Sequence, residues 1–392
     1  MSIKAGFAGS GFVAEIHADA VSRVGSTDVK LEGVYSPTKE NREEFAEEQG
    51  TKAFGSLEEL LDSVDVVHVC APTAEHERVA KEVLDRDKSV IVEKPLTGYH
   101  GEDHEDFNGD TFPKQDALDK AIDSVQRLIE AERKSEGQIL YAENWVYAPS
   151  IQKEVEILRK SEGQIIWMHG EESHSGSHSE DYAYWSRSGG GVMMMKGVHP
   201  LTAALYLKRV EGQVRYGEPI RPAAVSSRAH ALTRKEKFED AGHIRCDYHD
   251  IDDYSGQHII FEDGMVADIF AHDVVMGGIH NMIEVNANNH RTICNINPNT
   301  AMQTYTPDKK YFNDIYTVEK EETPEGWSFT SPDEHWFTGY PQEIEAFYEN
   351  VVEGTKPESD LSLAGDCIAT TYSSYVSDEQ GGKEVKVELP WD

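Results

Sequence analysis

Residues 1–97 alternate short apolar segments with amphipathic, helix-forming segments. Buried strands joined by helices are typical of βαβ units, whose strands form a parallel sheet. The pattern predicts strands at 3–8, 29–35, 64–71 and 89–93, a shorter strand at 51–54, and helices at 13–24, 39–49, 57–62 and 75–85. A helix at 116–134 and a strand at 138–142 complete a first domain, which we place at residues 1–143.

The second half of the chain changes character, because its apolar positions alternate with polar ones. This alternation predicts strands that bury one face, as in an open antiparallel sheet. The strands fall at 164–170, 223–231, 258–261, 265–272, 281–286, 291–295 and 386–389, and the helices at 150–159, 199–206, 340–352 and 361–375. We therefore predict an α/β protein whose second domain, residues 144–392, is α+β with a large, mostly antiparallel, open-faced sheet. We expect its C-terminal helix to pack back on the first domain.

Residues 98–112 interrupt the pattern with a polar, acid-rich stretch. His100 and His104 lie among carboxylates there, so a divalent metal site is conceivable, but a solvated surface insertion is the favoured interpretation. A cluster of His169, His174, His178 and His199 with Glu172 likewise has no diagnostic ligand spacing. We predict no metal site.

The net charge of −35, from 72 acidic and 37 basic residues, argues against nucleic-acid binding, which needs clustered Lys and Arg. The acidic residues are spread along the chain, which fits either a salt-rich cytoplasm or an ordinary acidic cytosolic enzyme. Four separated cysteines, the absence of a long apolar stretch and an N-terminus without a signal-like region all favour the cytoplasm.

The first predicted strand leads directly into Gly9-Ser10-Gly11-Phe12-Val13-Ala14. In a Gly-x-Gly-x-x-Ala loop between a strand and a helix, the first glycine allows the turn and the second lets the backbone approach a pyrophosphate. The small Ala14 permits close helix packing, and the helix N-terminus favours the phosphates. The loop therefore predicts a Rossmann dinucleotide-binding domain that uses residues 9–13.

The end of the second strand bears on the choice between NAD and NADP. An NAD enzyme usually carries an acid there, whereas this chain has Ser36, Thr38 and Lys39, which could hold a 2′-phosphate. We lean slightly towards NADP, and a plain turn and helix cap is the alternative. At the next crevice strand, Ala71-Pro72-Thr73 and His76 are further candidates for cofactor contacts.

Two polar positions are candidates for catalysis. Glu93-Lys94-Pro95 places a lysine at the carboxyl end of a strand, where its cation faces the ligand crevice and can polarise a substrate oxygen. Glu93 is counted among the cofactor-site residues, and a surface ion pair between Glu93 and Lys94 is the alternative. His199 follows a run of three glycines, 189–191, and can act as a general base, although a lone histidine on an apolar face is usually a core residue.

These motifs together resemble the Gfo/Idh/MocA oxidoreductases, the glucose–fructose oxidoreductase and inositol dehydrogenase family. The resemblance rests on residues 9–14, 71–73 with His76, 93–95, 189–199 and the segment 340–357. It implies hydride transfer to or from a sugar, sugar acid or cyclitol, and dimer or tetramer contacts through the open sheet. It also implies that Lys94 and His199 are catalytic.

The chain departs from that family at Met195, where an Asp usually stands four residues before the histidine. Lys196 follows and is a candidate for part of the missing role, with a helix-surface lysine as the alternative. The departure leaves room for a redox-neutral enzyme that recycles bound NAD(H) during glycosidic cleavage or epimerisation. A non-catalytic ligand sensor is a third possibility. The candidates for substrate binding are Asn144, Trp145, Tyr147, His178, Trp185, Lys196 and His199.

Overall fold

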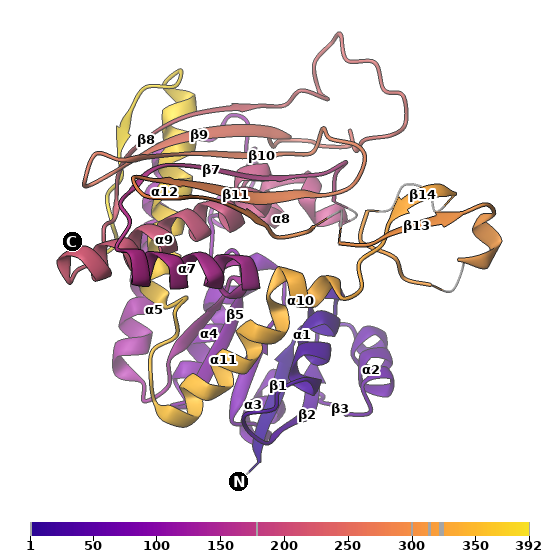
Figure 1. Ribbon diagram of the computed structural model, residues 1–392. Helices are drawn as coiled ribbons and strands as arrows, with labels where there is room; N and C mark the ends of the chain where they lie inside the picture. Colours follow the sequence, from indigo (N-terminus) through magenta and orange to yellow (C-terminus); the bar gives the residue numbers. More distant parts are fainter. Residues whose placement is uncertain (1, 178, 299–300, 313–314, 321–324, 392) are drawn as a thin grey trace.

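The computed structural model describes residues 2–177, 179–298, 301–312, 315–320 and 325–391. Its first domain is a six-stranded parallel sheet in the order β3-β2-β1-β4-β5-β6, with helices on both faces (Figure 1). The elements are β1 (Ile3–Ala8), α1 (Phe12–Ser22), β2 (Val29–Tyr35), α2 (Lys39–Glu48), β3 (Lys52–Ala53), α3 (Leu57–Ser63), β4 (Val66–Val69), α4 (His76–Leu84), β5 (Ser89–Glu93), α5 (Lys114–Lys134) and β6 (Ile139–Ala142). The strand order reverses between β1 and β4, the point at which such sheets bind ligands.

The second domain contains a seven-stranded mixed sheet in the order β12-β11-β7-β10-β9-β8-β15. Only β7 and β10 pair in parallel among these strands. The strands are β7 (Ile165–Ser173), β8 (Pro222–His230), β9 (Tyr254–Phe261), β10 (Val266–His272), β11 (His280–Ala287), β12 (Arg291–Asn295) and β15 (Val385–Lys386). The predicted α/β fold class, with a mostly antiparallel second sheet, is confirmed.

Helices α7 (Pro149–Ser161) and α9 (Val198–Tyr216) lie between this sheet and the first domain (Figure 1). The other helices of the second half are α6 (Asn144–Tyr147), α8 (Trp185–Ser188), α10 (Glu334–Thr338), α11 (Tyr340–Glu353) and α12 (Leu361–Glu379). Helix α9 packs on β7 and β11, whereas α11 contacts α1 and α12 contacts α5 of the first domain. The C-terminal helices therefore connect the two domains.

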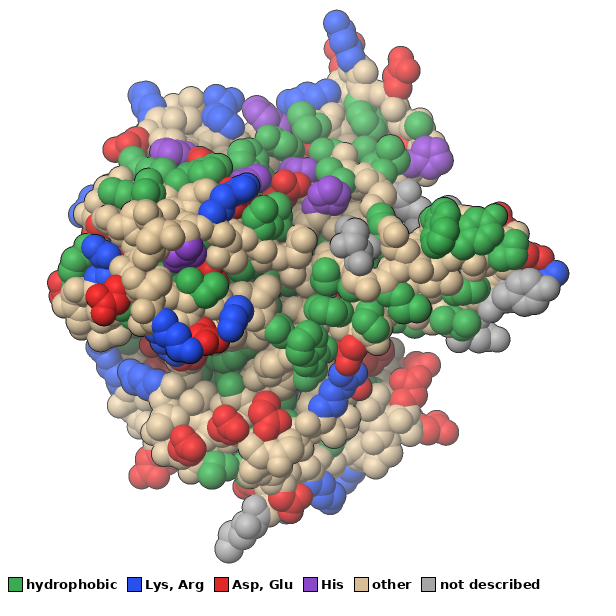
Figure 2. Space-filling model, viewed as in Figure 1, with side chains coloured by type: hydrophobic (Ala, Val, Ile, Leu, Met, Phe, Trp, Pro, Cys, Tyr) green, Lys and Arg blue, Asp and Glu red, His purple; other side chains and the backbone are tan. Residues whose placement is uncertain are grey.

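A two-stranded hairpin of β13 (Gln303–Thr306) and β14 (Gly326–Phe329) projects from the second domain. Hydrophobic side chains gather on it (Figure 2), and Trp327 is 74% exposed. Residues 298–333 lack a pattern of alternating apolar and polar positions, so this hairpin was not predicted from the sequence.

We expected the acid-rich segment 98–112 to be a solvated surface insertion, but part of it is buried. Tyr99 is buried and packs against Phe107 and Phe112, and its backbone N–H donates to the Tyr372 hydroxyl on α12. The Gly109 N–H donates to a carboxylate of the loop before β9, at Asp250. The segment therefore joins the two domains. No group of three or more His, Cys, Asp or Glu side chains in the described ranges is placed to hold a metal ion.

None of the helices among the described residues is long and apolar enough to span a membrane.

Candidate active site

A cleft of about 1080 Å³ runs along the carboxyl edge of the parallel sheet and continues to the start of α9. Its walls come from the glycine loop, the ends of β2, β4 and β5, and residues of the second domain around 172 and 195–199. The cleft therefore combines the predicted cofactor residues with the predicted catalytic residues.

The glycine loop fits a dinucleotide pyrophosphate. Gly9 has φ +121°, and a Cβ on it would lie 2.2 Å from the Cys70 carbonyl oxygen, whereas a Cβ on Gly11 would meet nothing within 4 Å. Gly11 is the N-cap of α1 and no side chain caps that end, so the first N–H groups of α1 are free for an anion. Ala14 is fully buried under the strand, as expected for close helix packing.

Alanine substitutions at the two glycines should separate folding from binding. Gly9→Ala forces a Cβ against backbone at positive φ and should lower stability by about 1–3 kcal/mol. Gly11→Ala has room in the free protein, so its melting temperature should stay unchanged while its Kd for NADH rises. Thermal melting and NADH fluorescence titration check both; equal melting temperatures for the two variants would contradict this account of the turn.

The three residues that were predicted to contact the ribose end of the cofactor differ in position. Ser36 and Thr38 line the cleft, and the Ser10 hydroxyl donates to Ser36 Oγ at 2.9 Å. Lys39 does not line it; the exposed ammonium lies 3.6 Å from Glu43. Arg42 donates to the Ser36 carbonyl.

His76 and Glu93 border the cleft, but both are tied into the scaffold. The His76 ring nitrogens lie 2.9 Å from the carbonyls of Ala71 and Pro95, so the ring bridges the loops after β4 and β5. Glu93 pairs with His17 at 2.8 Å and accepts the Lys94 N–H. Glu93 is therefore a buried partner of His17, and the alternative of a surface ion pair between Glu93 and Lys94 is wrong.

Lys94 extends into the cleft and is fixed from the second domain. Its Nζ donates to the Met195 carbonyl oxygen at 3.1 Å. Burial opposes its charge, but Tyr182 and Glu172 with the other nearby acids raise the pKa of Lys94 above its ordinary value. Lys94 thus carries a positive charge at neutral pH.

His199 lies in the first turn of α9, directly after a π-helical turn at Met193–Gly197. Its Nδ1 is 2.5 Å from Glu143 Oε1, and its ring stacks on Trp145 with centroids 5.8 Å apart. Burial and the charge of Lys94 lower the pKa of His199 to about 4, whereas burial raises the pKa of Glu143 well above its ordinary value. The imidazole is therefore uncharged at neutral pH and held in one orientation.

Lys196 is buried and forms a close ion pair with Asp273, a residue that follows β10. Burial lowers its pKa well below the ordinary lysine value. The lysine lines the cleft. Its partner there is Asp273, which is close in space but far away in the sequence. The alternative of a lysine extending from a helix surface into solvent is wrong.

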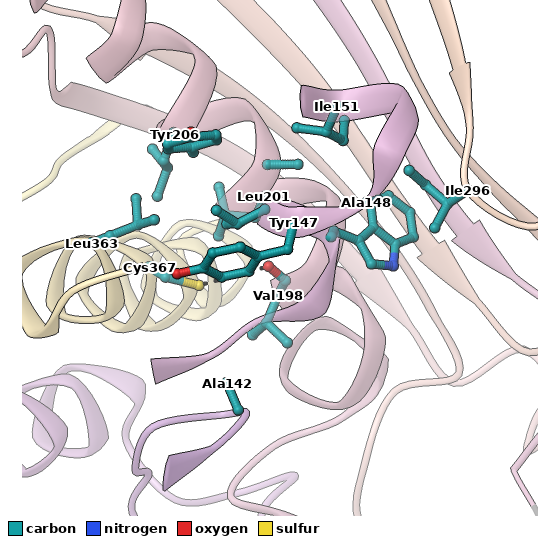
Figure 3. Packing of buried hydrophobic residues seen from close by; sticks show 14 of the residues in the cluster. Ala142, Tyr147, Ala148, Ile151, Val198, Leu201, Tyr206, Ile296, Leu363 and Cys367 are labelled. Carbon is teal, nitrogen blue, oxygen red and sulfur yellow. Dashed lines mark hydrogen bonds between the residues drawn. The ribbon is translucent and has the colours of Figure 1, made fainter. Parts of the chain in front are cut away.

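The remaining substrate candidates differ in position. Asn144 and Trp145 line the cleft, but Tyr147 does not. Its ring is in the hydrophobic core beside Val198, Leu201 and Cys367 (Figure 3) and its hydroxyl pairs with Ser359. Trp185 is also buried away from the cleft, with its indole N–H donated to the Tyr99 carbonyl. His178 lies outside the described residues.

Three carboxylates that were not predicted as site residues surround these groups: Glu143, Glu172 and Asp273. Glu143 had a detectable signal, because it follows β6 and Ala142 pairs with Glu93 in the sheet, which places Glu143 beside Lys94. Asp273 also follows a strand end, but nothing in the sequence links it to Lys196.

A model of an oxidoreductase family with an NAD-binding Rossmann fold, Gfo/Idh/MocA, matches residues 3–106. Residues 3–106 are therefore similar to the NAD-binding part of this family, and the rest of the chain lies outside the match. The same part of the chain is 34% identical over 93 residues to glucose-6-phosphate 3-dehydrogenase of Bacillus subtilis, covering 24% of this chain and 26% of that protein. It is 30% identical over 95 residues to UDP-N-acetylglucosamine 3-dehydrogenase of Acidithiobacillus ferrooxidans, covering 24% and 29%. The matches thus span only about a quarter of each of these relatives.

Solved structures extend the likeness to the second domain. GenD2 from gentamicin A biosynthesis, in complex with NAD, has a TM-score of 0.77 at 19% identity and covers 99% of this chain and 97% of its own. Myo-inositol 2-dehydrogenase from Lactobacillus plantarum has a TM-score of 0.71 at 17% identity, with 99% and 100% covered. At these identities the likeness concerns the fold alone, and it extends over the whole chain. The family supports NAD or NADP as the cofactor.

Proposed function

We propose that this protein is an NAD(P)-dependent dehydrogenase acting on a hydroxyl-bearing carbon of a sugar, sugar acid or cyclitol. The observation that carries the proposal is the placement of Lys94 and His199 in the same cleft as the glycine loop, with Glu143 bonded to His199 from behind the cleft wall. The two relatives named above are sugar dehydrogenases by their names, and one structural neighbour is named as a myo-inositol dehydrogenase, which supports the substrate class.

The side chains divide the chemistry. His199, uncharged and hydrogen-bonded to Glu143, accepts the hydroxyl proton at Nε2. Lys94 stabilises the negative charge that develops on the same oxygen as it becomes a carbonyl. The bound nicotinamide supplies the acceptor for the hydride that leaves the carbon. The raised pKa of Glu143 suits it to share the added proton, so that the pair takes up the proton as a unit.

A substrate panel tests the function. Glucose 6-phosphate, UDP-N-acetylglucosamine, myo-inositol, free hexoses and sugar acids are each incubated with NAD and with NADP, in low and high salt, and formation of reduced nicotinamide is followed by absorbance. We expect turnover with at least one hydroxylated ring. Product formation without net reduced nicotinamide would favour the redox-neutral alternative, and binding without any chemistry would favour a sensor. The slight lean to NADP predicts a lower Kd for NADPH than for NADH.

We also propose that the protein forms a homodimer or homotetramer through the outer face of the seven-stranded sheet. Ile293 on this face is 52% exposed and Trp167 is also partly exposed there. The four cysteines are free, which supports a reducing compartment such as the cytoplasm.

Ile293→Glu should break the proposed oligomer. The new carboxylate would be buried in an apolar contact without a partner, which costs more than a contact of this kind contributes. Sedimentation or light scattering should show the wild-type mass reduced to that of a smaller species, with an unchanged circular dichroism spectrum. Glu218→Gln, away from the sheet face, serves as the control. A monomeric wild type would overturn the proposed assembly.

A further inference from the structure

Glu172 is a buried carboxylate in the cleft to which the chemistry above gives no task. It lies near the end of β7, two residues after Gly170, and a Cβ on Gly170 would lie 2.9 Å from Pro200 Cβ. Since alternate residues of a strand share a face, Glu172 points to the same side, towards the start of α9. It is 8% exposed and lines the cleft together with Lys94, Lys196 and His199.

The neighbouring carboxylates have hydrogen-bond or ion-pair partners among the described side chains, whereas Glu172 has none. Glu143 is bonded to His199, and Asp273 pairs with Lys196 and accepts from the Tyr248 hydroxyl. Within the part of the chain that the structure describes, no side-chain hydrogen bond or ion pair reaches Glu172, and its Oε2 is buried without a partner. An unsatisfied buried carboxyl is destabilising, and a ligand that supplies a donor would remove that cost.

The charges around Glu172 limit the kind of donor. Lys94 lines the same cleft and carries a positive charge, so it would repel a ligand ammonium. A ligand phosphate or carboxylate would be repelled by Glu172 itself. A neutral hydroxyl meets neither objection. The reacting hydroxyl is already engaged by Lys94 and His199, so the hydroxyl that reaches Glu172 is a neighbouring one.

We propose that Glu172 accepts a hydrogen bond from a substrate hydroxyl adjacent to the one that is oxidised, so that the site selects a vicinal diol. This inference rests on the proposed function. It makes Glu172 a substrate-binding and specificity-determining residue, and it explains how the site holds a polyol although Met195 offers no carboxylate.

The test compares Glu172→Gln with wild type on D-glucose, on the panel member with the highest turnover, and on the monodeoxy analogues of each. We expect KM for the parent to rise about 10- to 100-fold, as for loss of a hydrogen bond to a charged group. KM for the analogue that lacks the adjacent hydroxyl should be nearly unchanged, as should Kd for NADH. Glu172→Asp should recover part of the loss. Glu171→Gln, on the same strand with its side chain on the opposite face, is the matched control and should behave as wild type.

Two further measurements keep the outcomes apart. The melting temperature of Glu172→Gln should equal or exceed that of wild type, because a carboxyl without a partner is removed; a clear decrease would show a structural role and overturn the inference. Saturation-transfer NMR with the same sugars and the enzyme–NADH complex measures binding without turnover. If the wild type turns over substrate but Glu172→Gln raises KM equally for the parent and the deoxy analogues, the inference is overturned and the proposed function stands. Absence of both binding and turnover for every member would overturn the proposed function and the inference with it.

Discussion

Lys94→Ala should lower kcat by about 10²- to 10³-fold, the loss typical of removing one group that stabilises a developing oxyanion. The ammonium is partly buried, positively charged and fixed by the Met195 carbonyl at 3.1 Å, so no solvent cation can take its place in the same orientation. Steady-state kinetics on the best substrate of the panel, with the Kd of NADH measured in parallel, would show the loss in kcat while cofactor binding remains.

The same variant has a second, independent effect on pH dependence. The charge of Lys94 contributes to lowering the pKa of His199 to about 4. Its removal should move that pKa upward, so the acid limb of kcat/KM should shift to higher pH. Lys30→Ala, which removes an exposed lysine paired with Glu32 at 2.9 Å, is the control. Unchanged turnover in Lys94→Ala on the true substrate would overturn the assignment of Lys94.

The dinucleotide half of the site was predictable because its signals are local. The turn, the helix start and the strand end that make up the glycine loop all occur within a few consecutive residues, and each residue type has one geometric reason to be there. The position of Lys94 followed from the rule that the carboxyl ends of parallel strands meet at one edge. The predicted bounds of β1, β2 and β5 therefore agree with the structure.

The substrate half depends on contacts between distant segments, which a single sequence does not reveal. Lys196 was considered as a replacement for the missing acid, but it is neutralised by Asp273, 77 positions further along the chain. Asp273 lies beside it because the π-helical turn that carries Lys196 packs on β10. Tyr147 was grouped with Trp145, yet two residues of helix turn a side chain by about 200°. Trp145 consequently stacks on His199 while Tyr147 enters the core.

Glu143→Gln should lower kcat by about three orders of magnitude, as expected when a histidine base loses the carboxylate that orients it and compensates its charge. In the wild type, Glu143 Oε1 lies 2.5 Å from Nδ1, so a proton accepted at Nε2 is balanced by the carboxylate. A glutamine keeps the size of the side chain but offers no negative charge. The protonated ring would then be a second buried cation beside Lys94, which disfavours the proton transfer.

The expected signature of Glu143→Gln is a loss in kcat with little change in the Kd of NADH or in melting temperature. Glu343→Gln is a suitable control. Glu343, on α11, is another buried carboxyl whose pKa is raised by burial, but it does not line the cleft. If Glu143→Gln kept kcat within about tenfold of wild type, the imidazole would not depend on its carboxylate. The proton would then have to leave by another group, and Glu172, a buried carboxyl that lines the cleft, would be the first to examine by the same substitution.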